Sequence, residues 1–466
     1  MSAAPSSGLR EHAATVVVSA LSTLFAVTLI LFTGVMGAAI DPNIIEGSGT
    51  FRVMLLMVSA IFILIALYVG AIVTANTFAT IIAGRTRTIA LYRLVGSTSA
   101  RIRSRVAAEG LLMGTIGALI GFALAEGLVL VATTFGPGWG WLPAGRDYPL
   151  FDPLALLAVV IVALTTWAAA WAGSRRVAAV SPIAATGASV ELRPEDARGR
   201  RARTVWAWIL IGIGVALLTG GILMSVVSPM ALVVSFFGGL FSFTGIAVGA
   251  HFIMPPVLRL TGKLIDRGPT GSLAAANAVR FPERSARSTI GLVIGVTLVV
   301  MFAVAMESYR TMALIAFDAD PAMEAALNET LGITTAIFTG LVGFSAVIAA
   351  VGMVNTLSLS VLQRTRELGL LRALGFTGSQ VRRMVLAESA QMTFAALGFG
   401  LVLGVFYGWV AAQSLIGSEV GFAAPSIPWL MLAGVAVFGI ALALIAAAAP
   451  ARRAVRVSPV TALAID

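Results

Sequence analysis

The sequence contains no cysteine, two histidines and a single lysine, and charged residues make up only 11% of its 466 positions. The absence of cysteine excludes disulfides, thiolate metal sites and lipidation on cysteine. The lysine, Lys263, lies in TGKLID, which lacks both the glycine spacing and the following Ser or Thr that a phosphate-binding loop needs. No cluster of histidines or carboxylates offers a catalytic or metal site, so we predict that the chain is not itself an enzyme.

Hydrophobic residues, in contrast, make up 59% of the chain, and the mean hydropathy is +0.98. A soluble globule of this length needs far more polar residues to cover its surface. Apolar runs long enough to cross the hydrocarbon core as helices occur ten times, without the alternating pattern of a transmembrane barrel. We therefore predict an all-α polytopic membrane protein with spans that begin near Ala13, Phe51, Val106, Pro153, Val205, Pro229, Thr289, Leu331, Met384 and Ile427.

Basic residues are distributed unevenly between the predicted loops. If the N-terminus is cytoplasmic and the spans alternate, 28 of the 31 basic residues fall inside, and only Arg52, Arg146 and Arg310 fall outside. Short loops rich in Lys and Arg resist translocation, so this bias supports both the span count and the orientation. We expect a multi-pass protein of the cell inner (cytoplasmic) membrane with both termini cytoplasmic. The dispersed net charge of +10 predicts contact with anionic membrane lipid and not with nucleic acid.

One basic stretch occurs twice. Arg364 to Glu388 (RTRELGLLRALGFTGSQVRRMVLAE) aligns without a gap with Arg85 to Glu109 (RTRTIALYRLVGSTSARIRSRVAAE), at an offset of 279 residues and with 11 of 25 positions identical. A second pair, RRVAAVSPIAA from Arg175 and RRAVRVSPVTA from Arg452, is offset by 277. Duplicated segments beside long apolar runs indicate an internal repeat of a membrane unit.

The ten spans divide as 4+2+4. We predict a first four-helix repeat over residues 1–190, a cytoplasmic polar linker over 191–204, a two-helix connector over 205–256 and a second four-helix repeat over 257–466. Both four spans and two spans return the chain to the cytoplasm, so the two repeats should be parallel, related by an axis along the membrane normal. The connector has no counterpart in either repeat, and it is either a lateral appendage or a connector that keeps the repeats parallel.

The later copy of the basic stretch predicts a short helix at the cytoplasmic surface. Leu368, Leu371 and Leu374 recur at three-residue spacing among arginines, which is typical of an amphipathic helix. Gly375, and Gly96 in the first copy, stand where a left-handed helix C-cap is expected.

The same stretch also predicts how the next span begins. Thr377 with Gln380 three residues later indicates a capping box, whereas in the first copy Thr98 keeps the cap but Arg101 replaces the glutamine. An ordinary positive-inside loop would explain the charges. It would not explain why the Gly, the Thr and the final Glu repeat as well.

The motif R-x-R-E-[LI]-[AG]-x-L-R-A-L-G-x-[TS]-x-x-Q-[VI], here Arg364 to Val381 after a span that contains Asn355, resembles the signature of FtsX-type permeases. These are the membrane subunits of MacB-like, or type VII, ABC transporters. The closing pattern R-R-A-x-x-x-[ST]-P-[VI]-x-A-L, at Arg452 to Leu463, is similar to the C-terminal mark of the family. The first repeat departs from the pattern, with Thr88 at the position of Glu367, and the two connector spans match only ten-span, BceB-like members.

This resemblance implies two parallel FtsX-like repeats in the permease subunit of an ABC transporter. It implies that the surface helix is a coupling helix, which docks on a separate cytoplasmic ABC ATPase subunit that acts as a dimer. ATP and Mg would be held by that partner, and no cofactor by this chain. The coupling residues implied by the family are Arg85, Arg87, Arg93, Gly96, Arg364, Arg366, Glu367, Arg372 and Gly375.

The predicted connections outside the membrane are short, over Asp41 to Thr50 and about Thr311 to Thr330, whereas relatives commonly carry a large extracytoplasmic domain there. This favours export or extraction of a hydrophobic or amphipathic substrate, such as a peptide, a lipid, a haem-like molecule or a drug. The alternative is a mechanotransmission or sensing permease that regulates a cell-envelope partner. A third hypothesis, an ion-driven carrier, lacks buried acids at the membrane midplane.

Few polar residues lie at membrane depth on the outer side. Glu126 in the third span, and Glu307, Tyr309 and Arg310 at the outer end of the seventh, are candidates for substrate contact or gating. Glu307 and Arg310 are also spaced for an i,i+3 ion pair at the interface.

Two further features have structural or functional interpretations. Glu109 and Glu388, taken to begin their spans, are expected either to stabilise a helix N-terminus or to take part in coupling. Glycines at four-residue spacing, Gly117 with Gly121 and Gly400 with Gly404 and Gly408, predict close helix packing.

Overall fold

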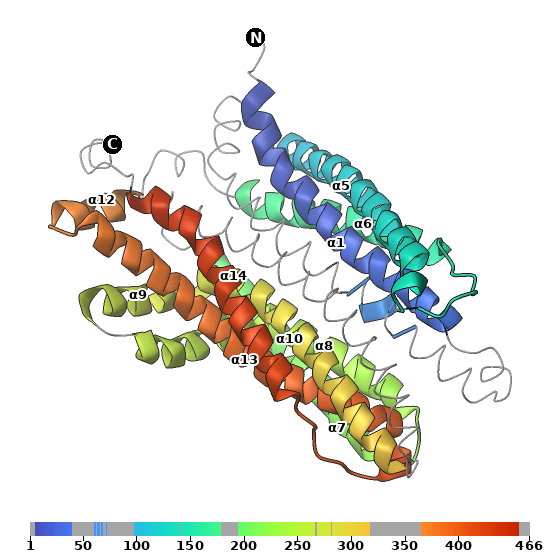
Figure 1. The fold of residues 1–466 in the computed structure, drawn as a ribbon. Coiled ribbons are helices and arrows are strands. Elements are labelled where there is room, and N and C mark those ends of the chain that lie inside the picture. Colours follow the sequence, from blue (N-terminus) through green and yellow to red (C-terminus); the bar gives the residue numbers. More distant parts are fainter. Residues whose placement is uncertain are drawn as a thin grey trace. The chain divides into compact units, whose positions relative to one another are not determined.

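The described elements are all helices. The structure, a computed structural model, describes residues 5–39, parts of 60–71, 97–140, 142–178, 194–265, 268–280, 282–316 and 365–455, and these ranges contain no strand. The chain forms two compact units, Met1–Val190 and Glu191–Asp466, whose helices are drawn in Figure 1. The predicted all-α class is therefore confirmed for the described part of the chain.

Seven of the described helices are long and apolar enough to cross a membrane. An eighth, α14 (Trp429–Val455), contains a shorter apolar stretch, Trp429–Ala441. These eight correspond to eight of the predicted spans, while the predicted starts near Phe51 and Leu331 lie outside the described residues. The chain is a multi-pass membrane protein, and the count of ten with its 4+2+4 division stays a prediction.

The first unit is described for three long helices and one short one. They are α1 (Pro5–Ala39), α5 (Ser99–Phe135), the 3-10 helix η1 (Pro137–Trp139) and α6 (Pro153–Ala178). Glycines of α5 allow close contact with its neighbours: a Cβ at Gly121 would meet the backbone carbonyl of Ala20 in α1, and one at Gly114 would lie 2.7 Å from the Cβ of Thr166 in α6. The predicted glycine packing is confirmed here.

The second unit contains α7 (Pro194–Met224), α8 (Ala231–Ile265), α9 (Gly268–Arg280), α10 (Pro282–Ala316), α12 (Thr365–Ala373), α13 (Gly378–Val420) and α14. In this unit α13 packs against α10, α8, α9 and α14 (Figure 1). Its glycines Gly400, Gly404 and Gly408 face α10; a Cβ at Gly400 would lie 2.9 Å from that of Val296. Residues 194–203, expected as part of a polar linker, form the first turns of α7.

The duplication is visible in the helices. α1 and α10 are both 35 residues long and begin 277 positions apart, and α5 and α13 begin 279 positions apart. The most apolar stretches of α1 and α10 are each 78% buried, against 28% for α5 and 44% for α13. α1 and α10 are therefore the most buried of the candidate membrane spans in their respective units.

One interpretation of the sequence is wrong. Glu109 and Glu388 were expected to begin their helices, but α5 begins at Ser99 and α13 at Gly378, so each carboxylate lies ten residues farther along. The stabilising field of a helix N-terminus fades within the first turn and cannot explain either residue. Glu388 is buried, at 4% exposure, and Glu109 lies 3.4 Å from Nε of Arg105, one turn earlier.

Candidate functional site

The short helix α12 (Thr365–Ala373) lies where the sequence predicts a surface helix. Glu367 is in its first turn and Arg372 in its last, so both charges suit the helix dipole. Leu370 and Leu374 point outward, with 51% and 73% of their surfaces exposed. α12 therefore presents Leu370 between an acidic and a basic residue, and the second exposed leucine, Leu374, directly follows the helix.

A glycine turn ends α12. Gly375 has a φ of +101°, which residues with a Cβ rarely adopt. Its N–H donates to the carbonyl of Arg372 at 3.1 Å, and the N–H of Phe376 donates to that of Leu371 at 3.0 Å. These two bonds form a Schellman motif, so the predicted left-handed C-cap is confirmed in the second unit.

The next helix begins directly after this turn. The backbone N–H of Gln380 donates to Oγ1 of Thr377 at 3.3 Å, and the backbone N–H of Thr377 donates to Oε1 of Gln380 at 2.7 Å. This is the predicted capping box. In the first unit Thr98 accepts from the backbone N–H of Arg101 at 3.4 Å, without the returning bond.

An apolar cluster holds the turn against the unit. Leu371 of α12 and Phe376 of the turn pack on buried residues of three other helices. These buried residues are Ala274 of α9, Val381, Met384 and Val385 of α13, and Ala451 of α14. We call Thr365–Gln380 the elbow. Its orientation is fixed by hydrogen bonds within the turn and by burial of two side chains.

The elbow brings together Glu367, Arg372 and Gly375 of the predicted coupling residues. Arg366 belongs to the same helix, and its side chain is not described. The other predicted coupling residues lie outside the described residues: Arg85, Arg87, Arg93, Gly96 and Arg364.

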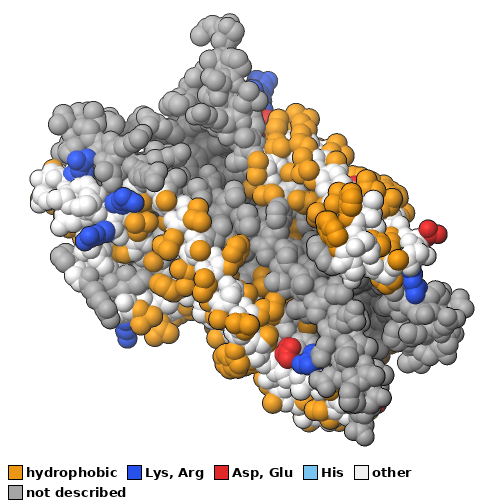
Figure 2. Space-filling model, in the orientation of Figure 1, with side chains coloured by type: hydrophobic (Ala, Val, Ile, Leu, Met, Phe, Trp, Pro, Cys, Tyr) orange, Lys and Arg blue, Asp and Glu red, His pale blue; other side chains and the backbone are white. Residues whose placement is uncertain are grey.

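Further basic residues surround the elbow. Arg382 and Arg383, in the first two turns of α13, are exposed and were not among the predicted coupling residues. Figure 2 shows Lys and Arg side chains gathered at the end of the second unit that carries α12 and α9, while hydrophobic side chains cover the flanks of its helices. Within the described ranges, no three side chains of His, Asp or Glu lie close enough to hold a metal ion.

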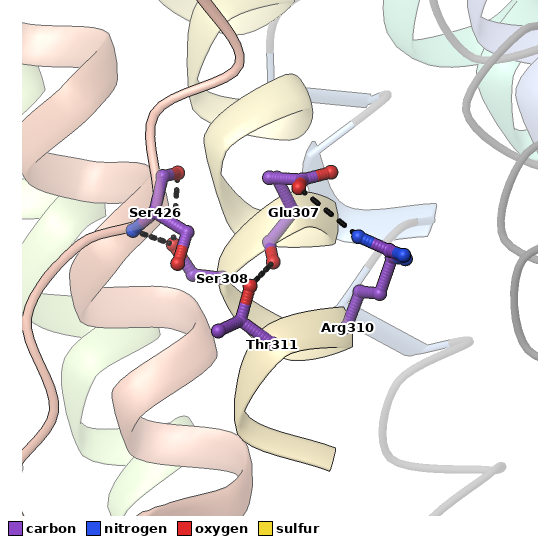
Figure 3. Close-up of polar contacts among 5 residues, drawn as sticks. All are labelled: Glu307, Ser308, Arg310, Thr311 and Ser426. Carbon is purple, nitrogen blue, oxygen red and sulfur yellow. Dashed lines mark hydrogen bonds and ion pairs between the residues drawn. The ribbon is translucent and has the colours of Figure 1, made fainter. Parts of the chain in front are cut away.

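At the opposite end of α10, Glu307 and Arg310 form the predicted i,i+3 ion pair, with Oε1 and Nη1 3.4 Å apart (Figure 3). Surface pairs of this kind contribute little stability. Tyr309 packs beside Met312 and Ala313 at the contact between α10 and α13. A role of these residues in substrate contact stays a prediction.

Next to this pair, the connection from α13 to α14, residues 421–428, is bonded to the helices along its length. We call it the outer strap. The N–H of Ser426 donates to Oγ of Ser308 at 3.1 Å (Figure 3), and the indole N–H of Trp409 donates to the carbonyl of Ala423 at 2.8 Å. The amide of Gln413 donates to the carbonyl of Gly421 at 2.8 Å and accepts from the N–H of Ala423 at 3.1 Å. Backbone groups of the outer strap are thus hydrogen-bonded by side chains of α10 and α13.

Interhelical hydrogen bonds also attach the α7–α8 hairpin to α13, which sequence reasoning missed. The amide of Gln391 donates to the carbonyl of Leu258 at 2.8 Å, and the hydroxyls of Tyr407 and Ser242 are 2.8 Å apart. Farther out, the hydroxyls of Ser414 and Ser235 are 2.6 Å apart, and Gln413 donates to Ser225 at 3.2 Å. The hairpin is therefore an integral part of the second unit. Polar residues inside the apolar run of α13 were the available signal.

Two remaining polar residues in spans have different environments. Glu126 in α5 is half-buried, and its Oε1 is buried without a hydrogen-bond partner. His251 in α8 contacts Oγ1 of Thr204 through Nε2 at 3.0 Å and the carbonyl of Val248 through Nδ1 at 3.2 Å, so both ring nitrogens have partners within the unit. Glu126 therefore stays a candidate for substrate contact.

Comparison with known proteins finds ABC transporter permeases. The chain is 32% identical over 141 residues to the uncharacterized ABC transporter permease YknZ of Bacillus subtilis, covering 30% of this chain and 34% of that one. It is 33% identical over 138 residues to the ABC transporter permease YtrF of the same organism, covering 27% and 31%. It is 32% identical over 132 residues to the macrolide export ATP-binding/permease protein MacB of Salmonella typhimurium, covering 28% and 20%.

The chain thus spans about a third or less of each of these relatives. The family model for the FtsX-like permease C-terminal domain matches twice, over residues 60–182 and 339–459. Each match begins before a copy of the repeated basic stretch and runs through the two helices that follow it, α5 and α6 or α13 and α14. Because the two matches cover just over half of its residues, the chain belongs to the FtsX-like permease family.

Proposed function

We propose that this chain is the membrane subunit of an ABC transporter, and that it couples ATP hydrolysis in a separate ATP-binding subunit to export or extraction of a hydrophobic or amphipathic substrate. The observation that carries the proposal is the elbow. It is a short helix with outward leucines, Leu370 and Leu374, fixed to the start of a continuous span.

Docking of a partner on α12 has a physical rationale. Leu374 exposes 73% of its surface at the end predicted to be cytoplasmic, and covering it in an apolar groove would gain about 25 cal/mol per Å² buried. Glu367 and Arg372, one at each end of α12, would set the direction in which the helix lies in that groove. Because the Schellman turn and the capping box leave no free residue between α12 and α13, a displacement of α12 would move the base of α13 with it.

The nucleotide chemistry is assigned to the partner. Lys263, the one lysine of the sequence, does not lie in a phosphate-binding loop. ATP and Mg would therefore be bound by the partner, as a dimer that presents one docking groove to each repeat. MacB, as its name states, is an ATP-binding and permease protein, which makes a functional link between the two activities reasonable for this family.

The outer side of the second unit supports the proposed substrate class. The outer strap between α13 and α14 is only eight residues long, and its backbone is bonded to the helices beneath it. With little protein outside the membrane at this point, a substrate taken from the membrane itself is favoured. Peptides, lipids, haem-like molecules and drugs share the required hydrophobic or amphipathic character.

The proposal is tested by charge reversal in the elbow and at the matching position of the first copy of the repeated stretch, Arg372→Glu combined with Arg93→Glu. We expect the double variant to bind the ATPase subunit at least tenfold more weakly and to lose transport-linked hydrolysis, because like charges would replace complementary ones. Copurification measures assembly, and ATPase assays in proteoliposomes measure coupling. Arg146→Glu, at a position predicted to lie outside, is the control for loss of charge. Normal assembly and transport by the double variant would show that the coupling assignment is wrong.

A further inference from the structure

Aromatic and polar contacts join α7 and α8 at the end of the hairpin that is predicted to be cytoplasmic. Trp208 of α7 stacks on Phe252 of α8, with ring centroids 5.4 Å apart and an interplanar angle of 21°. One turn earlier on α7, Oγ1 of Thr204 lies 3.0 Å from Nε2 of His251 on α8. Trp208 nevertheless exposes 60% of its surface, so the stack faces outward from the unit.

Length places this stack at the inner boundary of the hydrocarbon core. A helix crosses the core in about 20 residues. Counted from Met224, at the outer end of α7, that distance reaches the neighbourhood of residue 205; counted from Ala231 of α8, it reaches the neighbourhood of residue 250. Both estimates end beside the stack, and tryptophan is enriched at this interface.

Basic side chains lie beyond the stack, toward the predicted cytoplasmic side. Arg201 lies seven residues before Trp208 on α7, and Arg259 lies seven residues after Phe252 on α8. Seven residues are two helical turns, so Arg201 is on the same face of α7 as Trp208 and about 10 Å beyond it. On α8, which is helical through Pro255 and Pro256, Arg259 also lies beyond its aromatic residue toward the same end. Lys263 is one turn farther on the same face of α8. The two arginines thus extend from two neighbouring helices beyond the same stack.

These three side chains are available to a ligand. All three are exposed, and no carboxylate among the described residues pairs with any of them. Arginine binds phosphate oxygens through a planar fork of donors, and a cation near the anionic leaflet gains about 1 kcal/mol. An aromatic platform with two arginines one headgroup layer away therefore matches a phospholipid, with its acyl chains beside the stack and its phosphate between the arginines.

We propose that this face of the hairpin is a binding site for one anionic phospholipid of the inner leaflet, held by Arg201 and Arg259 with Lys263 as a further cation. The site gives the hairpin a role independent of ATP coupling: it anchors α13, to which the hairpin is hydrogen-bonded, at a fixed depth in the membrane.

The test is tryptophan quenching in vesicles by phosphatidylglycerol or phosphatidylcholine brominated on the acyl chains. The signal of Trp208 is the difference between the unchanged chain and Trp208→Phe, which keeps an aromatic ring in the stack. We expect this signal to be quenched more strongly by brominated phosphatidylglycerol. The preference is the ratio of the two binding constants, for phosphatidylglycerol and for phosphatidylcholine, obtained from the quenching curves. This ratio should fall about 30-fold in Arg201→Gln with Arg259→Gln, since two cations at about 1 kcal/mol each are lost.

Two controls keep the result specific. Arg201→Lys with Arg259→Lys retains both charges and should retain most of the preference, which separates loss of the site from loss of the fold. Arg101→Gln with Arg382→Gln removes two other exposed arginines, and the preference should persist. An equal loss in this control pair, or equal quenching by the two lipids, would refute the site. Displacement of the lipid by millimolar inorganic phosphate would show that a free anion, and not a lipid, is the ligand.

Discussion

The spans α5 and α13 are duplicates that differ most in what covers them. In α13 the residues Gln391, Tyr407 and Ser414 hydrogen-bond to α8. The positions 279 residues earlier in α5 hold Leu112, Leu128 and Phe135, with 57%, 50% and 53% of their surfaces exposed. The three polar contacts of one copy are thus three exposed apolar residues in the other.

This difference shows how a duplicated membrane helix acquires a neighbour. Apolar side chains suit contact with lipid tails, which offer no hydrogen bonds, whereas polar side chains hold helices together inside a membrane. Only the second unit contains the hairpin, and only its copy of the helix has the polar residues to bind it. The contacts shared by both copies, in turn, are the glycine seams along α1 and α10.

The shared seams should give the largest effects. Valine at Gly121 would meet backbone atoms of Ala20 and Leu24, which cannot move aside, and we expect a loss of about 3 kcal/mol in unfolding free energy. Gly400→Val should cost about 1–3 kcal/mol, because it meets the side chain of Val296. Denaturant titrations in mixed micelles, followed by circular dichroism, measure both. Gly127→Val, in open space, is the control, and a comparable loss there would show that the seams are not special.

The polar contacts that distinguish the units come next. Gln413→Leu removes a fully buried amide, and leaves Ser225, Gly421 and Ala423 without their bonds to it, at an expected cost of about 2–3 kcal/mol. Its counterpart in α5, Thr134, is exposed, and Thr134→Leu should change stability by less than about 0.5 kcal/mol. The same titrations compare the two. Equal effects would mean that the strap and the hairpin do not depend on this residue.

Substitutions at the N-caps of α13 and α5 should show the smallest difference in stability between the two copies. Thr377→Ala removes one half of a capping box and should cost about 1 kcal/mol, while Thr98→Ala removes a single 3.4 Å bond and should cost about half as much. Hydrogen exchange at the first turns of α13 and α5 measures both. Gln380→Ala should abolish the difference between the two positions. If it does not, the reciprocal bond is not its cause.

Local features were predictable because they depend on a few adjacent residues. The left-handed Gly375 and the Thr377 cap follow from their immediate neighbours, and the structure has both. The apolar run of this span begins only near Met384, but the capping box at Thr377 predicted an earlier helix start, and α13 is helical from Gly378. Burial of one face against α9 and α14 supplies the stability that the segment's composition does not indicate.

The attachment of the hairpin could not be predicted in the same way. Gln391 and Leu258 are separated by 133 positions, and nothing in either local sequence specifies the other. Gln391, Tyr407 and Gln413 were nevertheless visible as polar residues in an apolar run, at positions where the first copy has Leu112, Leu128 and Thr134. A comparison of the two copies residue by residue would have identified them as positions needing partners.

The length of α13 has a mechanical consequence. Its 43 residues contain no proline and rise roughly 64 Å, more than the roughly 40–45 Å of a whole bilayer. Such a helix is rigid. Its first turns pack against Phe376, and its last turns are hydrogen-bonded to the outer strap. A tilt of α13 imposed at its N-terminal end would therefore displace the outer strap at its C-terminal end, because the helix has no proline at which it could bend.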